Sequence, residues 1–342
     1  MKNKKISIKD IASELGVSVT TVSFVLNNKA EEKRISKEVT KKVLAYVEKV
    51  NYKPNSLAQS LRTGKSKVLV CMLEDISNDF FAKLARHIED IAYQKGYKIL
   101  FCSNDNDDEK SIELIDLFLE RQVDGFLLTP SPNLQPKILE LEKRNIPVVL
   151  LDRFFEKENF NYVGIDNEEA SKLGVEHLLE NNYNKIGFIS IDMNQTQMNA
   201  RLLGFDEAIN KHQLYAQKLI LKAKDSSEEK INQIKLFLND HSDLDSILFS
   251  TNYLTFLGLK ALKENDPKRL NELGIISFDD NSFFEICKPS ITTLKQPLDK
   301  IAKEAMRIMF KNLDSNSTVN AEMINLKTEL KLRESTQLIN NN

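Results

Sequence analysis

Residues 7–29 read SIKDIASELGVSVTTVSFVLNNK, and their apolar residues recur at the spacing of short helices. Ser7 is placed to cap a first helix, with Asp10 three residues later in a capping-box-like arrangement, and Gly16 ends that helix. Ser18 is placed to cap a second helix after a short turn, and a third helix follows from residue 36. This order of elements predicts a helix-turn-helix unit that binds DNA.

The distribution of charge favours the same interpretation. Residues 1–65 contain fourteen Lys and Arg against six Asp and Glu, a formal charge of +8. The other residues contain thirty-four against forty-four, a formal charge of −10. A basic N-terminal unit on a larger acidic body is typical of a nucleic-acid-binding module joined to another function. The alternative is a solvated basic tail, which regular apolar spacing argues against.

A short segment with its own helical signals follows the third helix. Pro54 prevents that helix from continuing, and Asn55 is placed to cap a helix over Ser56–Arg62. About eight residues are too few for a stable isolated helix, so this one needs a partner. Beside its twin on DNA, it could insert Leu61 between base steps of the minor groove. The alternative is a flexible linker.

From residue 66 onward, apolar β-rich runs alternate with amphipathic helical stretches, which predicts parallel α/β sheets with helices on both faces. The predicted strands are Val68–Leu73, Lys98–Cys102, Gly125–Leu128, Val148–Leu151, Tyr162–Ile165, Lys185–Ser190, Ser246–Ser250 and Ile275–Phe278. The predicted helices include Phe80–Gln94, Glu109–Glu120, Gln135–Lys143, Glu168–Glu180 and Asn199–Lys211.

Polar residues follow the predicted strands at their carboxyl ends, where parallel sheets bind ligands. Examples are Asp152-Arg153 after Leu151, Asn252 after Ser250, and Asp279-Asp280 after Phe278. Carboxylates and amides suit sugar hydroxyls, and Arg suits a hydroxyl pair or a carboxylate. An Asp in such a place often only caps the next helix, and this alternative applies to Asp152 and Asp166.

The chain resembles the LacI/GalR family of bacterial transcription regulators over about residues 6–337. The segments that carry the resemblance are residues 7–29, ISKEVTKKVLAYVEKVNYKPNSLAQSLRTGKS, EDISNDFFAKL, LLDR, VGIDNEEA, ARLLGFDEAI, GIISFDDN and PSITTLKQPLDKIAKEA. The resemblance implies a lambda-repressor-like helix-turn-helix domain at 1–54 and a hinge helix and linker at 55–65. It also implies a periplasmic-binding-protein-like core of two parallel-sheet lobes at 66–337. The expected N-terminal lobe is about 66–162 and 293–320, and the C-terminal lobe about 163–292 and 321–337.

The resemblance also places functional residues. Base edges would be read by Val19, Thr20 and Phe24, and a phosphate contacted by Ser23, while the hinge would contribute Asn55, Ala58 and Leu61. The effector would be bound by Asn78, Phe80, Thr129, Asp152, Arg201, Asn252 and Asp279.

The sequence departs from the family pattern at several of these places. Phe24 stands where the family most often has Arg, so it can pack on a thymine methyl but cannot bind guanine. The alternative is that Phe24 packs inward on the hinge or on a partner helix. Tyr253 stands where the family has Asp, Asp79 replaces a common Pro, and Ala302 a common Gly. No aromatic residue lies at 223–225, where some relatives stack a ring on their ligand.

The expected function is therefore that of a cytoplasmic homodimer that binds a palindromic operator, with repressor favoured over activator and a sugar-type effector favoured. A purine- or nucleoside-responsive corepressed regulator, or an activator, is the alternative. No cofactor or metal is expected, because the three cysteines and four histidines lack metal-ligand spacing. An enzyme is disfavoured by the lack of GxGxxG, P-loop and GxSxG motifs. An exported sugar-binding protein or a membrane protein is disfavoured because no signal peptide or long apolar run is present.

Overall fold

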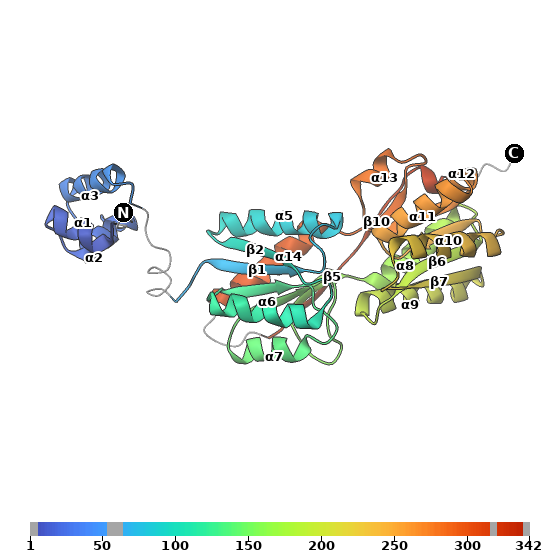
Figure 1. Cartoon of the computed structure of the whole chain (residues 1–342), viewed down its shortest axis with the longest axis horizontal. Coiled ribbons are helices and arrows are strands. Elements are labelled where there is room, and N and C mark those ends of the chain that lie inside the picture. Colours follow the sequence, from blue (N-terminus) through green and yellow to red (C-terminus); the bar gives the residue numbers. More distant parts are fainter. Residues whose placement is uncertain (1–5, 53–63, 315–319, 338–342) are drawn as a thin grey trace. The chain divides into compact units, whose positions relative to one another are not determined.

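The computed structural model describes residues 6–52, 64–314 and 320–337. The chain forms two separate compact units, residues 1–66 and 67–342, and each is described by itself (Figure 1). The predicted hinge residues Asn55, Ala58 and Leu61 lie outside the described residues.

The first unit is a three-helix domain, built from α1 (Ile8–Leu15), α2 (Val19–Leu26) and α3 (Lys37–Lys49). Ser7 and Asp10 form the expected capping box, and Gly16 ends α1 with φ of 64°, a left-handed conformation that suits glycine. Ser18 and Ser36 cap the next two helices. One small core joins the three helices, and its fully buried members are Ile11, Ala12, Val22, Val25 and Val43.

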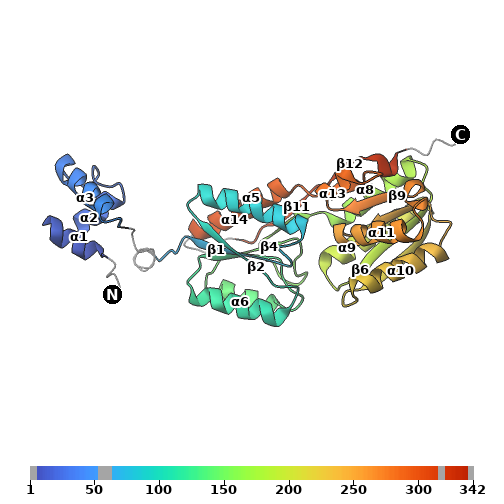
Figure 2. The same ribbon diagram turned by 45° about the horizontal axis from the view of Figure 1, so that its top comes forward.

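The second unit contains two six-stranded sheets, one in each of two lobes (Figure 2). The N-terminal lobe has a parallel sheet in the order β11-β5-β4-β3-β1-β2. Its strands are β1 (Val68–Leu73), β2 (Lys98–Ser103), β3 (Gly125–Leu128), β4 (Val148–Leu151), β5 (Tyr162–Ile165) and β11 (Met323–Leu326). One face packs against α5 (Asp79–Gln94) and α14 (Leu298–Asp314), the other against α6 (Asp108–Glu120) and α7 (Gln135–Lys143).

The C-terminal lobe has a sheet in the order β12-β10-β9-β8-β6-β7, in which only the β10–β12 pair is antiparallel among the described strands. Its strands are β6 (Lys185–Asp192), β7 (Tyr215–Lys222), β8 (Ser246–Phe249), β9 (Gly274–Phe278), β10 (Thr292–Lys295) and β12 (Glu329–Lys331). Helices α8 (Asn167–Glu180) and α9 (Thr196–His212) cover one face. The other face is covered by α10 (Ser227–Asp240), α11 (Asn252–Asn265) and α13 (Ser282–Ile286), with α12 (Arg269–Glu272) beside them.

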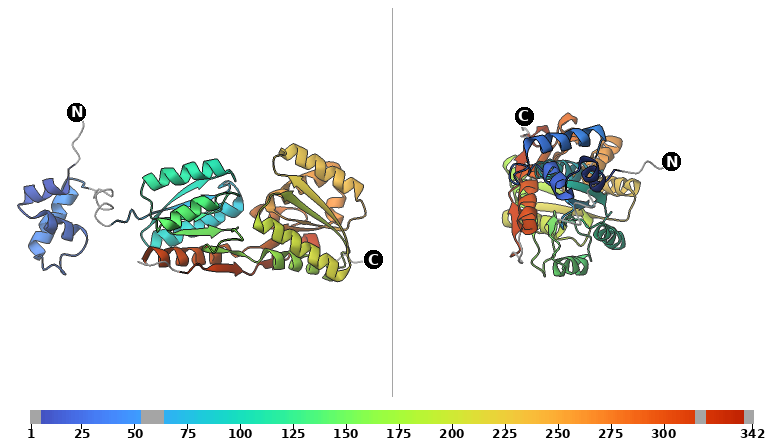
Figure 3. Two further views of the ribbon diagram at one scale, coloured as in Figure 1. Left: turned by 90° about the horizontal axis from the view of Figure 1, so that it is seen from below. Right: turned by 90° about the vertical axis from the view of Figure 1, so that its left-hand side faces the viewer.

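Within the described residues, the chain passes between the lobes three times. The passages lie between β5 and α8, between β10 and α14, and between β11 and β12, and Figure 3 shows the last of them in red. The sequence predicts these boundaries near 162, 293 and 320, a few residues too early for the first and last. Because each lobe contains segments from distant parts of the sequence, the lobes form one folded unit. In the described part of the chain, no helix is both long and apolar enough to span a bilayer.

Candidate functional site

Polar side chains from both lobes meet at the carboxyl ends of the parallel strands. Asn78, which caps α5, and Asn252, at the start of α11, form a reciprocal pair of amide hydrogen bonds across the lobes. The Asn252 Nδ2 to Asn78 Oδ1 distance is 3.0 Å, and the opposite bond is 3.4 Å. Two of the residues expected to bind an effector are therefore in direct contact, although they are far apart in the sequence.

Arg201 is the best-anchored cation of this region and is only 2% exposed. Its Nε donates to Asn167 Oδ1 at 2.8 Å, and its Nη1 donates to the Ser250 carbonyl at 2.6 Å. Its guanidinium also lies over the Phe278 ring, 4.3 Å from the centroid, which is a favourable cation–π distance. Contacts with α8, with the residue that follows β8 and with β9 thus fix the position of the guanidinium group.

Asp152 follows β4 and has a left-handed φ of 68°, which is uncommon for a residue other than glycine. Burial raises the pKa of its carboxyl to about 6, although Arg153 and Arg201 oppose the rise. Its Oδ2 accepts a hydrogen bond from Gln197 Nε2 of the other lobe at 3.2 Å. Strained backbone and a buried carboxylate together are typical of functional sites rather than of helix caps.

Asp279 takes the equivalent position after β9, with φ of 66° and an exposure of 7%. Burial raises the pKa of its carboxyl, against the influence of Arg201 and of a 2.7 Å hydrogen bond from Gln296 Nε2. The charge of Arg201 therefore acts to lower the pKa of both aspartates, which come from different lobes. Asp166, by contrast, caps α8 by accepting from the Glu169 amide, so the capping alternative describes it well.

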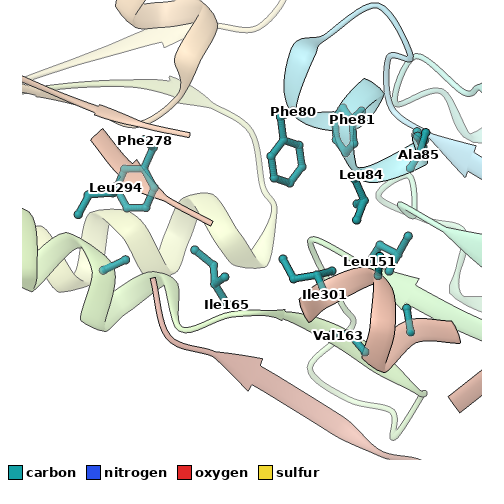
Figure 4. Close-up of a cluster of buried hydrophobic side chains, with 14 of the residues drawn as sticks. Phe80, Phe81, Leu84, Ala85, Leu151, Val163, Ile165, Phe278, Leu294 and Ile301 are labelled. Carbon is teal, nitrogen blue, oxygen red and sulfur yellow. The ribbon is translucent and has the colours of Figure 1, made fainter. Parts of the chain in front are cut away.

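The remaining expected effector residues lie at the same strand ends. Thr129 follows β3, between the ends of β1 and β4, and is completely buried. Phe80 belongs to a hydrophobic cluster that includes residues of both lobes, among them Phe81, Ile165 and Phe278 (Figure 4). The site therefore combines polar strand ends with an apolar wall.

Several buried polar atoms of this region have no hydrogen-bond partner within the described residues. They are Thr129 Oγ1, Arg153 Nε and Nη1, Gln197 Oε1 and Ser250 Oγ. A buried polar group without a partner costs about 1–3 kcal/mol, so such groups are rarely left unused. These donors and acceptors come from both lobes, and a small polar ligand could supply partners for them.

Four further polar residues belong to this region. Glu74 and Arg153 follow predicted strands but were not among the expected effector-binding residues, and Gln197 and Gln296 were not predicted at all. Arg153 is 3% exposed and forms an ion pair with Glu74 at 2.7 Å, which leaves its other two nitrogens without partners among the described residues. The signal for Arg153 was present, since it directly follows Asp152 at a strand end. Gln296 directly follows β10, a strand that the sequence did not predict, and Gln197 lies in the first turn of α9. The folded lobes bring Gln197 to Asp152 and Gln296 to Asp279.

Tyr253, at the position where the family pattern has Asp, also faces this region. Burial raises the pKa of its phenol to about 12, and the nearby Glu74 carboxylate adds to the rise. The Tyr253 phenol lies close enough to Glu74 and Arg153 for the charges of both to influence its pKa.

The expected base-reading residues lie on α2 of the first unit. Val19 is 41% exposed and Thr20 is exposed in the first turn, whereas Ser23 and Phe24 are half-buried. The Nζ of Lys33 lies 5.7 Å from the centroid of the Phe24 ring. The start of α2 thus presents small and apolar side chains to the solvent, with a cation beside Phe24.

Each of the two units matches a known protein family. Residues 7–55 match the model of bacterial regulatory proteins of the lacI family, and residues 175–336 match a periplasmic-binding-protein-like domain. A ribose operon repressor of Halalkalibacterium halodurans is 31% identical over 97% of each chain. Catabolite control protein A of Priestia megaterium is 28% identical over 97% of this chain and 99% of its own. The structure of a lac repressor dimer bound to operator has a TM-score of 0.85 at 20% identity, and covers 98% of this chain and all of its own.

Proposed function

Because the chain belongs to the LacI family of bacterial regulatory proteins, we propose that it represses transcription from a palindromic operator under the control of a small neutral polyhydroxylated molecule. It acts by binding, on DNA in the cytoplasm, and performs no catalysis. The observation that carries the proposal is the set of buried, partly unpartnered polar groups between the lobes, in a chain whose other unit is a helix-turn-helix domain.

The charges of the interlobe site favour a neutral ligand. The Asp152 carboxyl is influenced by two cations, Arg153 and Arg201, and by two further carboxylates, Asp279 and Glu74. Three acids against two bases leave a formal charge of −1, and Arg153 is already paired with Glu74. A phosphate or carboxylate on the ligand would meet repulsion here, whereas hydroxyl groups can donate to the acids and accept from the guanidinium groups.

A calorimetric comparison of three ligand classes tests this proposal. D-ribose, D-ribose 5-phosphate and hypoxanthine are titrated into the full chain, and operator affinity is measured with and without each. We expect D-ribose, the neutral sugar, to bind and to weaken operator binding, and D-ribose 5-phosphate to bind at least tenfold more weakly. Tight binding of hypoxanthine with stronger operator binding would instead support a purine corepressor.

Effector affinity should depend on pH through Asp152. Its raised pKa of about 6 means that the carboxyl is ionised at pH 7.5 and largely protonated at pH 5. Only the ionised form accepts hydrogen bonds with both oxygens, so effector affinity should fall as the pH is lowered through 6. Titrations between pH 5 and 8 would show this decline, and an Asp152→Asn chain should bind weakly with little pH dependence. An equally steep pH profile in that variant would assign the dependence to another group.

Phe24 is proposed to select an A·T pair in the operator. Its ring can contact a thymine methyl, whereas Arg would donate two hydrogen bonds to guanine. In selection from a random DNA pool, Phe24→Arg should change one position of each half-site from A·T to G·C, at a cost of about 1–3 kcal/mol for the original operator. An unchanged consensus would show that Phe24 does not face the bases.

Two copies of the chain are proposed to bind the operator together, because one helix-turn-helix unit reads only a half-site. The C-terminal lobe exposes a candidate contact surface made of Phe256 on α11 and of Phe283 and Ile286 on α13. These side chains are 50%, 43% and 77% exposed, and the two phenylalanine rings lie 5.8 Å apart. Phe256→Asp should shift the protein from dimer to monomer in sedimentation velocity, whereas Leu236→Asp, at an exposed residue of α10, should not.

A further inference from the structure

Three consecutive side chains at the start of α9 each form a hydrogen bond to the opposite lobe. Gln195 Nε2 donates to Asn106 Oδ1 at 2.9 Å, and Gln197 Nε2 donates to Asp152 Oδ2 at 3.2 Å. Between them, Thr196 Oγ1 accepts from the Phe154 amide at 3.3 Å and lies 3.4 Å from the Phe154 carbonyl. No other described segment of this length makes so continuous a set of side-chain bonds between the lobes.

At the start of α9, a contact between the lobes takes the place of a helix-capping hydrogen bond. Gln195 is the N-cap of α9, yet its side chain makes no capping hydrogen bond. The side chain reaches across to Asn106 instead, and its Oε1 accepts a second bond from Gln197 Nε2 at 2.9 Å. Gln195 and Gln197 are 6% and 4% exposed, so water does not readily replace these bonds.

The partner residues on the N-terminal lobe are also held in place. Asp105 and Asn106 are both left-handed, with φ of 53° and 59°, and the Asn106 amide donates to the side chain of Asn104. Asn104 is completely buried and bonds to the Thr129 carbonyl. Both sides of the contact are therefore preorganised, which lowers the entropy cost of forming it.

We infer that Gln195, Thr196 and Gln197 form a latch that holds the two lobes closed. The three passages between the lobes are short connections that can act as hinges, so they alone do not fix the closure angle. Only the consequence of the latch rests on the proposed function: the fraction of molecules that are already closed determines how much effector binding can still shift the open–closed equilibrium. Closure itself can be measured without effector or operator.

Each hydrogen bond of this kind changes an equilibrium about two- to tenfold. Replacing Gln195 by Leu and Thr196 by Val together removes at least two such bonds and should therefore shift the open-to-closed ratio by about four- to hundredfold, while leaving every proposed ligand-binding residue in place. Thr196→Ser retains the hydroxyl and should retain closure. Gln233→Leu is the matched control, because Gln233 bonds within its own lobe, to Asp225 at 2.7 Å.

Spin-label distances in the full-length protein test the latch. Labels are attached at Glu113→Cys on α6 and Asn232→Cys on α10, both exposed, in a chain with Cys102 and Cys287 changed to Ser. Labelled protein is diluted with unlabelled protein, so that distances between copies do not contribute. We expect one closed distance for the parent, for Thr196→Ser and for Gln233→Leu, and an added open population for Gln195→Leu/Thr196→Val.

If the double variant keeps the parent's distance distribution, the latch does not hold the lobes and the inference is wrong. The inference is equally wrong if Gln233→Leu opens the lobes to the same extent, because the loss of a side-chain bond outside the latch would then have the same effect. Should the double variant not fold, as judged by thermal unfolding, each single substitution is measured in the same way and must show a smaller open population. None of these outcomes bears on whether the chain binds an operator, so failure of the latch and failure of the proposed function remain distinguishable.

Discussion

An Arg201→Ala chain is expected to bind its operator as the parent does and to lose its response to effector. Arg201 is anchored by Asn167 and the Ser250 carbonyl, and it is the cation shared by Asp152 and Asp279. Removal of one partner from a buried charged cluster costs about 2–5 kcal/mol, so effector affinity should fall at least about thirtyfold. Operator affinity measured across an effector titration reports both properties at once.

Arg269→Ala provides the matched control for this prediction. Arg269 is a partly buried arginine of the same lobe that donates to the His241 carbonyl at 2.9 Å, away from the interlobe site. Its loss should lower thermal stability and leave the effector response intact. An Arg201→Ala chain that still responds at the parent's effector concentration would show that Arg201 only supports the fold.

An Ile11→Asp chain is expected to lose operator binding altogether and to keep its effector-binding unit folded. Ile11 is completely buried in the small core of the first unit. A buried unpaired carboxylate costs several kcal/mol, which is comparable with the whole stability of a domain of this size. Because residues 1–66 and 67–342 are separate units, calorimetry should show the transition of the larger unit unchanged.

Leu44→Asp introduces the same charge change on the surface of the same domain. Leu44 lies on α3 and is 48% exposed, so the domain should stay folded and operator affinity should fall only modestly, with a stronger dependence on salt. Equal loss of binding in both variants would mean that added negative charge, rather than unfolding, is responsible for the effect of Ile11→Asp.

Local sequence signals were sufficient for the N-terminal domain. The capping box of Ser7 and Asp10, the glycine at 16 and the caps at Ser18 and Ser36 all act within a few residues, so the structure has the helices where the sequence predicts them. The buried strands of the larger unit were equally clear, because continuous apolar runs of four to six residues between polar ends mark the interior of a parallel sheet.

Strands β7, β10, β11 and β12 were not predicted from the sequence, whereas β2, which is also an edge strand, was predicted. Strand β7 lies at the edge of its sheet, and only Leu221 of its eight residues is buried. Three of its residues are lysine or glutamine, so it lacks the continuous apolar run that marks a buried strand. Strands β11 and β12 are four and three residues long, and none of their residues is buried. Their pairing is decided by segments more than 30 residues away, which no local pattern reports.

For the proposed site residues, tertiary contacts decide whether a polar residue after a strand lies in the site or caps a helix. Asp152 and Asp166 look alike in the sequence, since each follows a buried strand. The structure uses Asp166 as a helix cap and places Asp152 in a left-handed turn against Gln197 of the other lobe. Gln195 and Gln197 could not have been chosen from local patterns, because their partners come from loops about 45 to 90 residues earlier.

Selection of DNA from a random pool by the purified full chain, at two salt concentrations and beside a 67–342 truncation, decides whether this chain is a sequence-specific regulator. We predict a palindromic consensus that survives the higher salt, disappears with the truncation, and is released by the effector found calorimetrically. A pool without enriched sequence, whose binding collapses as salt is raised, would mean that the basic N-terminal unit contacts phosphates only, and the proposed repressor function would then be wrong.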